Sequence, residues 1–168
     1  HIPNRLGIIT RCWGDEKEGF VPSGKLKKRQ IREGKFVPAD LQTAYNNLVG
    51  EGILLFETSP VHGRSMSRMK LSAEDIMSTC IEEYQESDIS PIIVETFPNK
   101  IWQRTSNALK TAFTESCDKM GVSNVEVYQA QRIGWLPSGG ILKGMEDIVI
   151  EDGNANYVRS EEHTSELQ

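Results

Sequence analysis

The chain of 168 residues lacks several features that would assign it to a class directly. It has only three cysteines, Cys12, Cys80 and Cys117, which are widely spaced and odd in number. Such a set argues against a disulfide scaffold and suits a reducing compartment. No apolar run approaches the roughly 20 residues of a membrane-spanning helix. We therefore expect no membrane partner.

Positive charge is also scarce, because 19 lysines and arginines face 24 acidic residues and the net charge is -5. A protein that binds nucleic acid through its overall charge carries a positive excess, so we expect no nucleic-acid partner. The exception is the basic stretch 25–35, which we interpret as a solvated loop or short helix. A phosphate- or RNA-binding patch is the alternative, although no aromatic residue interleaves the stretch.

Glycine-rich nucleotide motifs are missing as well. Gly14 and Gly19 lie five residues apart, but no Gly-Lys-Ser/Thr follows them, which excludes a phosphate loop. No Gly-x-Gly-x-x-Gly follows the first apolar run either. An open sheet that binds a dinucleotide would carry that motif at this place.

Short apolar runs alternate with helical patterns along the chain. We predict strands at 6–10, 53–56, 92–94 and 125–130, with a fifth beginning at 155. The segments between them are long enough to be crossover helices, so the sheet should be parallel. An open doubly wound sheet and part of a (β/α)8 barrel both fit this order. The missing dinucleotide motif favours the barrel, with about four β/α units of its N-terminal half present.

Capping residues mark the expected helices. Asp40 should begin a helix whose apolar face is Leu41, Ala44, Tyr45, Leu48 and Val49, stopped by Gly50 and Gly52. Ser72 and Asp75 resemble a capping box for the next helix. Ser106 should cap the third helix and Gly121 should end it, and the fourth should run from Gly140 to Gly153.

A polar cluster follows the second predicted strand. Glu57, Ser59 and His62 come where this strand leaves the core. Titratable groups at the carboxyl end of a parallel strand are the usual place for chemistry in α/β folds. His62 is the only histidine in the body of the chain, since His1 and His163 lie at its ends. We therefore expect part of any active site here.

The order of local motifs resembles the first half of an aldo-keto reductase, closest to the plant and algal plastid branch, over residues 5–158. The motifs are Leu6-Gly7-Ile8, Trp13-Gly14-Asp15, Ala44-Tyr45, Gly52-Ile53 with Leu55-Phe56, Val61-x-Gly63, Leu109-Lys110, Val125-x-Val127-Tyr128-Gln129 and Gly140-x-Leu142-x-Gly144-Met145. The resemblance implies a (β/α)8 barrel that uses NADP(H) to reduce small aldehydes or ketones without a metal. It also implies a chloroplast location, with the cytoplasm as the alternative.

That family's chemistry uses a tyrosine as proton donor, a lysine that lowers the tyrosine pKa, an aspartate paired with the lysine and a histidine that orients the substrate. The resemblance places Glu57 at the aspartate position, His62 at the tyrosine, Thr96 at the lysine and Gln131 at the histidine. All four are substituted, so we expect this chain to be inactive. An acid–orienter pair of His62 and Glu57 is one alternative. A catalytically dead homologue with a nucleotide-binding or scaffold role is the other.

The last ten residues, 159–168, resemble the translation of a sequencing adapter, with an ordinary polar, disordered tail as the alternative. We accordingly predict a partial barrel domain over 1–158 and a non-native or disordered tail over 159–168. The resemblance implies that most NADP(H) contacts come from later strands, so no cofactor-binding residue is assigned. Open sheet edges in such a half barrel predict poor solubility or self-association.

Overall fold

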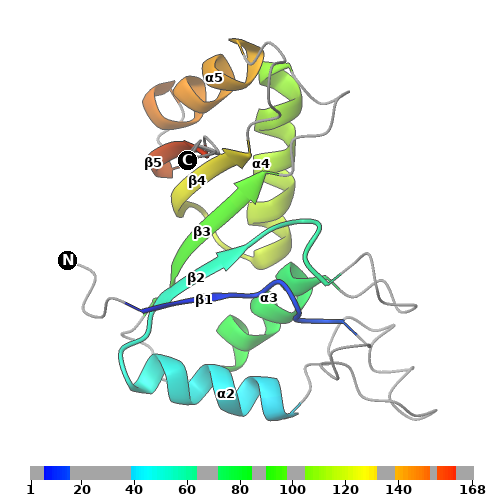
Figure 1. The fold of residues 1–168 in the computed structure, drawn as a ribbon, viewed down its shortest axis with the longest axis vertical. Helices are drawn as coiled ribbons and strands as arrows, with labels where there is room; N and C mark the ends of the chain where they lie inside the picture. The colour runs from blue at the N-terminus through cyan, green and yellow to red at the C-terminus, as the bar shows by residue number, and fades with distance from the viewer. Residues whose placement is uncertain are drawn as a thin grey trace, which may run out of the picture.

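The computed structural model describes residues 6–15, 39–63, 72–84, 90–97, 105–131, 139–151 and 155–161. Strands and helices alternate along these residues, as the sequence predicts (Figure 1). The elements are β1 (Gly7–Ile9), α2 (Ala39–Gly50), β2 (Leu55–Thr58), α3 (Ala73–Glu83), β3 (Ile92–Phe97), α4 (Ser106–Met120), β4 (Val125–Gln131), α5 (Gly139–Glu146), the π-helical turn η1 (Asp147–Glu151) and β5 (Ala155–Glu161).

The five strands form one sheet in the order β1-β2-β3-β4-β5, and every neighbouring pair is parallel. Strands that follow one another in sequence are therefore also neighbours in space, as in a barrel rather than in a doubly wound sheet. Figure 1 shows the helices to one side of the sheet, with α2 and α5 towards its two ends. The predicted fold class, an α/β sheet from the first half of a (β/α)8 barrel, is confirmed.

The two faces of the sheet differ in burial. Residues that face the helices, such as Phe56, Ile93 and Tyr128, are at most 3% exposed and pack into the core. Tyr45 of α2 packs on Phe56, and Phe113 of α4 meets Tyr128 edge to face. The intervening positions of β2 and β3 are only partly buried. An apolar run such as 53–56 predicts a strand buried on both faces, but no described helix covers the second face (Figure 1).

Helix ends follow the predicted chemistry with small differences. The Ser72–Asp75 capping box is present, and Gly121 ends α4 with a positive φ of 71°. The cap of α4 is Thr105 rather than Ser106, whose hydroxyl instead donates to Asp147 at 2.8 Å. This contact ties α4 to the η1 turn.

Three further details of the predicted helices and strands differ slightly from the structure. α2 begins at Ala39, so Asp40 is already inside the helix, and Ala44 is exposed rather than part of the apolar face. β3 runs to Phe97, three residues beyond the predicted end, because the polar pair at 95–96 alternates between the two faces of the sheet. The basic stretch 25–35 and Gly153 lie outside the described residues.

Candidate functional site

A chain of side-chain hydrogen bonds crosses the carboxyl ends of β2, β3 and β4. The Gln129 amide nitrogen donates to Thr96 Oγ1 at 2.6 Å, and Thr96 Oγ1 donates to Glu57 Oε1 at 3.2 Å. Strand register explains why they meet, because Glu57 pairs with Val94, two residues before Thr96, and Thr96 pairs with Gln129. All three side chains therefore stand on the sheet face opposite the helices.

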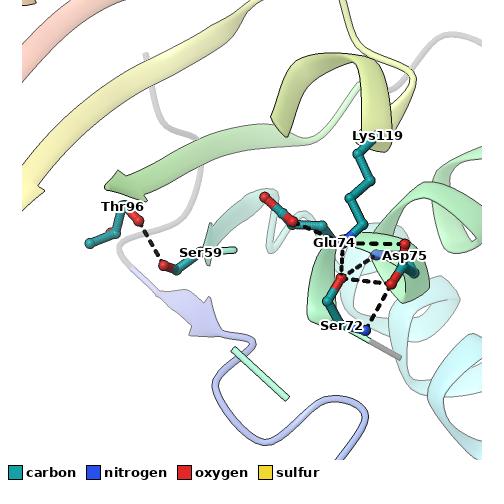
Figure 2. A network of polar contacts seen from close by, with 6 residues as sticks. All are labelled: Ser59, Ser72, Glu74, Asp75, Thr96 and Lys119. Carbon is teal, nitrogen blue, oxygen red and sulfur yellow. Dashed lines mark hydrogen bonds and ion pairs between the residues drawn. The ribbon is translucent and has the colours of Figure 1, made fainter. Parts of the chain in front are cut away.

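The residue that follows β2, Ser59, is also hydrogen-bonded to Thr96. Ser59, 1% exposed, donates its hydroxyl proton to the Thr96 carbonyl at 2.7 Å (Figure 2). Thr96 is thus held by Ser59 through its backbone, while its hydroxyl accepts from Gln129 and donates to Glu57. A residue fixed at both backbone and side chain has little freedom to change partners.

His62 is held in a turn against the end of β1. Its backbone N–H donates to the Ser59 carbonyl at 3.0 Å, and its carbonyl accepts from Ala73 at 3.0 Å. Its Nδ1 lies 3.5 Å from Thr10 Oγ1. The turn passes so close to β1 that a Cβ at Gly63 would lie 1.9 Å from the Trp13 carbonyl oxygen.

The surroundings of His62 favour its neutral form. Burial, and then the positive charge of Arg11, lower the pKa of His62 below the usual 6.5. Desolvation and a nearby cation both penalise the imidazolium. At neutral pH the ring is therefore uncharged, with one nitrogen as donor and the other as acceptor.

Solved structures with a similar architecture include several aldo-keto reductases. The thermostable aldo-keto reductase Tm1743, in complex with epalrestat, matches 92% of this chain with 47% of its own length, at a TM-score of 0.63 and 15% identity. An aldo/keto reductase from Klebsiella pneumoniae, in complex with NADP and acetate, matches 94% of this chain with 46% of its own, at a TM-score of 0.62 and 15% identity. The holo form of AKR11C1 from Bacillus halodurans gives a TM-score of 0.58 at 13% identity.

The chain has the fold of the first half of an aldo-keto reductase barrel. It spans about half the length of these structures, as their covered shares of 47%, 46% and 45% show. At 13–15% identity the match concerns the fold. No family model matches the chain, and no curated protein matches it.

Within this aldo-keto reductase fold, the structure brings together two of the four predicted site residues, Glu57 and Thr96. His62 contacts Thr10 instead, so His62 and Glu57 have separate partners among the described residues. Gln131 ends β4, and its side chain is outside the described set.

Sequence reasoning missed Gln129, which is 4% exposed and bonded to Thr96. Gln129 stands two residues before Gln131, at an alternate position that shares its face with Thr96 across the β3–β4 pair. Strand register was the signal that could have found it, because the residue opposite Thr96 follows once β3 and β4 are aligned. The resemblance directed attention to Gln131 alone.

The donors at the strand ends are already engaged. The Gln129 amide donates to a hydroxyl, and that hydroxyl donates to a carboxylate. Among the described residues no cation pairs with Glu57, and no group of three or more potential ligands could hold a metal ion. The arrangement of these side chains can accept and orient hydrogen bonds, but it holds no cation–acid pair for proton transfer among the described residues.

None of the helices in the described part of the chain is long and apolar enough to cross a membrane.

Proposed function

We propose that this chain derives from an aldo-keto reductase-type, NADP(H)-dependent oxidoreductase and that it does not itself reduce aldehydes or ketones. The fold and the ordered motifs support the first part. The hydrogen-bond chain from Gln129 through Thr96 to Glu57 carries the second, because it occupies the strand ends where a proton donor and its activating cation are needed.

Reduction of a carbonyl needs a proton at the oxygen as hydride reaches the carbon. Thr96 commits its hydroxyl proton to Glu57, and a hydroxyl that has no cation beside it among the described residues is a poor acid. His62 is neutral at neutral pH because its pKa is lowered, and it contacts Thr10 rather than Glu57. Neither residue offers the acid that this chemistry requires.

The residues at these strand ends also do not fit the phosphates of NADP(H). Glu57 places a carboxylate at the strand ends, and the groups bonded around it, Thr96, Gln129 and Ser59, are neutral. Phosphate binding favours cations or clustered backbone N–H groups. NADP(H) would supply hydride when bound, but no step involving it follows from these residues.

The test is an NADPH oxidation assay with the purified chain and a panel of aliphatic and aromatic aldehydes. We expect consumption at the buffer rate and no quenching of NADPH fluorescence. Turnover by the parent chain that is lost in His62→Ala but kept in His163→Ala would contradict the proposal. Fluorescence quenching without turnover would instead support the alternative of a dead homologue that still binds nucleotide.

The proposed cellular location rests on the same resemblance to aldo-keto reductases. We propose the chloroplast, with the cytoplasm as the alternative, because the motif order is closest to the plastid branch of the family. Fractionation of source cells, probed with an antibody against the chain, tests this assignment. Recovery outside the plastid fraction would contradict it.

A further inference from the structure

A second polar cluster lies on the opposite side of the sheet, between β3 and the helices α3 and α4. Its centre is Glu95 of β3, which is 1% exposed on the helix-facing side. Glu74, in the first turn of α3, is 2% exposed and shares this environment. Two acids buried together are costly when both are ionised.

Hydrogen bonding in the cluster is incomplete. Both carboxyl oxygens of Glu95, one oxygen of Glu74 and the Thr58 hydroxyl are buried without a hydrogen bond of standard geometry among the described residues, although the Ser116 hydroxyl lies near enough to Glu95 to favour its charged form. Thr58 stands beside Glu95 in the β2–β3 register, so these two side chains are neighbours, and the charge of Glu74 acts on Glu95 from α3. Buried polar groups in native proteins are nearly always hydrogen-bonded. The cluster therefore needs a donor that the ionised side chains do not supply.

Within the part of the chain that the structure describes, Lys119 is the cation paired with this cluster. Lys119 of α4 contacts Glu74 Oε2 at 3.1 Å, Asp75 Oδ1 at 3.3 Å and the Ser72 hydroxyl (Figure 2). These contacts join the last turn of α4 to the first turn of α3. Among the described residues, Lys119 thus pairs with two acids, Glu74 and Asp75, and its charge also acts on Glu95. A proton on one acid would reduce the excess negative charge.

We propose that Glu95 is a neutral carboxylic acid that donates its proton to the free oxygen of Glu74, and that losing this proton loosens α3 and α4 from β3. One proton satisfies an oxygen on each acid and leaves Glu74 charged for Lys119. The hydrogen-bonded pair of Glu95 and Glu74 then helps to hold the two helices on β3, and this attachment weakens as the pH rises.

The groups facing Glu95 come from every element packed on it. Burial raises the pKa of Glu95 well above its usual range, and the Glu74 charge raises it further, while the Ser116 hydroxyl and Lys119 oppose the shift. The Cys117 thiol of α4 and the Tyr128 hydroxyl of β4 also adjoin it, and burial raises the pKa of each. Neither supplies positive charge.

The sign of the pH effect follows from the raised pKa. Because the unfolded chain releases this proton at lower pH than the folded chain, the free energy of unfolding falls as pH rises above about 4.5. The decrease continues up to the folded-state pKa. For one group in a chain of this size it corresponds to roughly 4 °C in Tm per pH unit.

The test compares Tm between pH 5 and pH 8 for the parent chain, Glu95→Gln and the exposed α4 control Glu115→Gln. We expect Glu95→Gln to melt higher than the parent at pH 8 and to lose most of the pH-dependent decrease. Glu115→Gln should retain the parent profile. Identical slopes in the parent and Glu95→Gln would overturn the proposal.

A second measurement does not depend on the variant folding. Carboxyl-carbon NMR of the 13C-glutamate-labelled parent chain should show one protonated glutamate at neutral pH. In Glu74→Gln its titration should move to lower pH, because the neighbouring negative charge is gone. A parent chain whose glutamates are all ionised at neutral pH would contradict the assignment.

Discussion

At the scale of single residues, Thr96 is the centre of the candidate site. Its hydroxyl both accepts from Gln129 and donates to Glu57, and its carbonyl accepts from Ser59. A lysine at this position would place a cation beside Glu57, whereas threonine leaves a neutral bridge between an amide and a carboxylate. We propose that Thr96 stands at the lysine position of the reductases, so that a structural hydrogen-bond chain takes the place of a proton-transfer pair.

Removing the Thr96 hydroxyl should destabilise the fold. Thr96→Val keeps the branched shape but leaves Gln129 without its acceptor and Glu57 without its donor. We expect a loss of about 1–3 kcal/mol in the free energy of unfolding, measured with urea. Thr96→Ser, which retains the hydroxyl, should lose less. Equal losses in both variants would show that the hydroxyl contributes nothing.

His62 makes its own contribution to pH dependence. Because its folded pKa lies below 6.5, the unfolded chain takes up the proton first as the pH falls. The stabilising contribution is present above about pH 6.5 and is lost towards lower pH, at up to about 1.4 kcal/mol per pH unit. His62→Asn should therefore lose less stability than the parent between pH 7.5 and pH 5 in urea titrations. A steeper loss in the variant would contradict this sign.

At the scale of elements, the turn after β2 fixes where the site residues stand. Gly63 has a φ of +69°, and its N–H donates to the Arg11 carbonyl at 3.2 Å. The Trp13 carbonyl oxygen fills the space where a side chain would begin. This close approach holds His62 beside Thr10 and away from Glu57.

A side chain at Gly63 should therefore disturb the turn. Gly63→Ala forces either a clash with Trp13 or a backbone shift, and we expect a loss above about 1 kcal/mol in thermal or urea unfolding. Gly50→Ala is the matched control, because a Cβ at Gly50, which ends α2, meets nothing within 4 Å. Unchanged stability in Gly63→Ala would contradict the described packing.

The elements show how far sequence reasoning reached. Alternating apolar runs and caps were enough to predict each described strand and the four α-helices, because these signals are local. The Thr105 cap and the η1 turn were missed because Ser106 has a distant partner, Asp147, which no local pattern encodes. Gln129 was missed for the same reason, since its role depends on pairing with β3.

At the scale of the whole molecule, the sheet leaves apolar surface uncovered within the described residues. Leu6 and Ile9 are 60% and 59% exposed at β1, which is one end of the strand order. An apolar edge strand invites pairing with another chain. The domain boundary at 158 stays a prediction, and β5 extends through Arg159 to Glu161.

Charge on this edge should reduce self-association. We expect the parent chain to associate in a concentration-dependent manner in sedimentation velocity, and Ile9→Lys to shift it towards monomer. Leu142→Lys, at a 53% exposed position on α5, tests whether any added charge has this effect. A monodisperse parent monomer, or equal effects of the two variants, would contradict the role of β1.

Hydride transfer from labelled NADPH is the sharpest test of inactivity, because an aldo-keto reductase fold whose described residues supply no proton donor should not complete the reaction. The chain is incubated with NADPH deuterated at the transferred position and a reactive aromatic aldehyde, and the alcohol product is examined by mass spectrometry. We expect no deuterated alcohol above the enzyme-free control. Deuterated alcohol that disappears in both Glu57→Ala and Thr96→Val would contradict it.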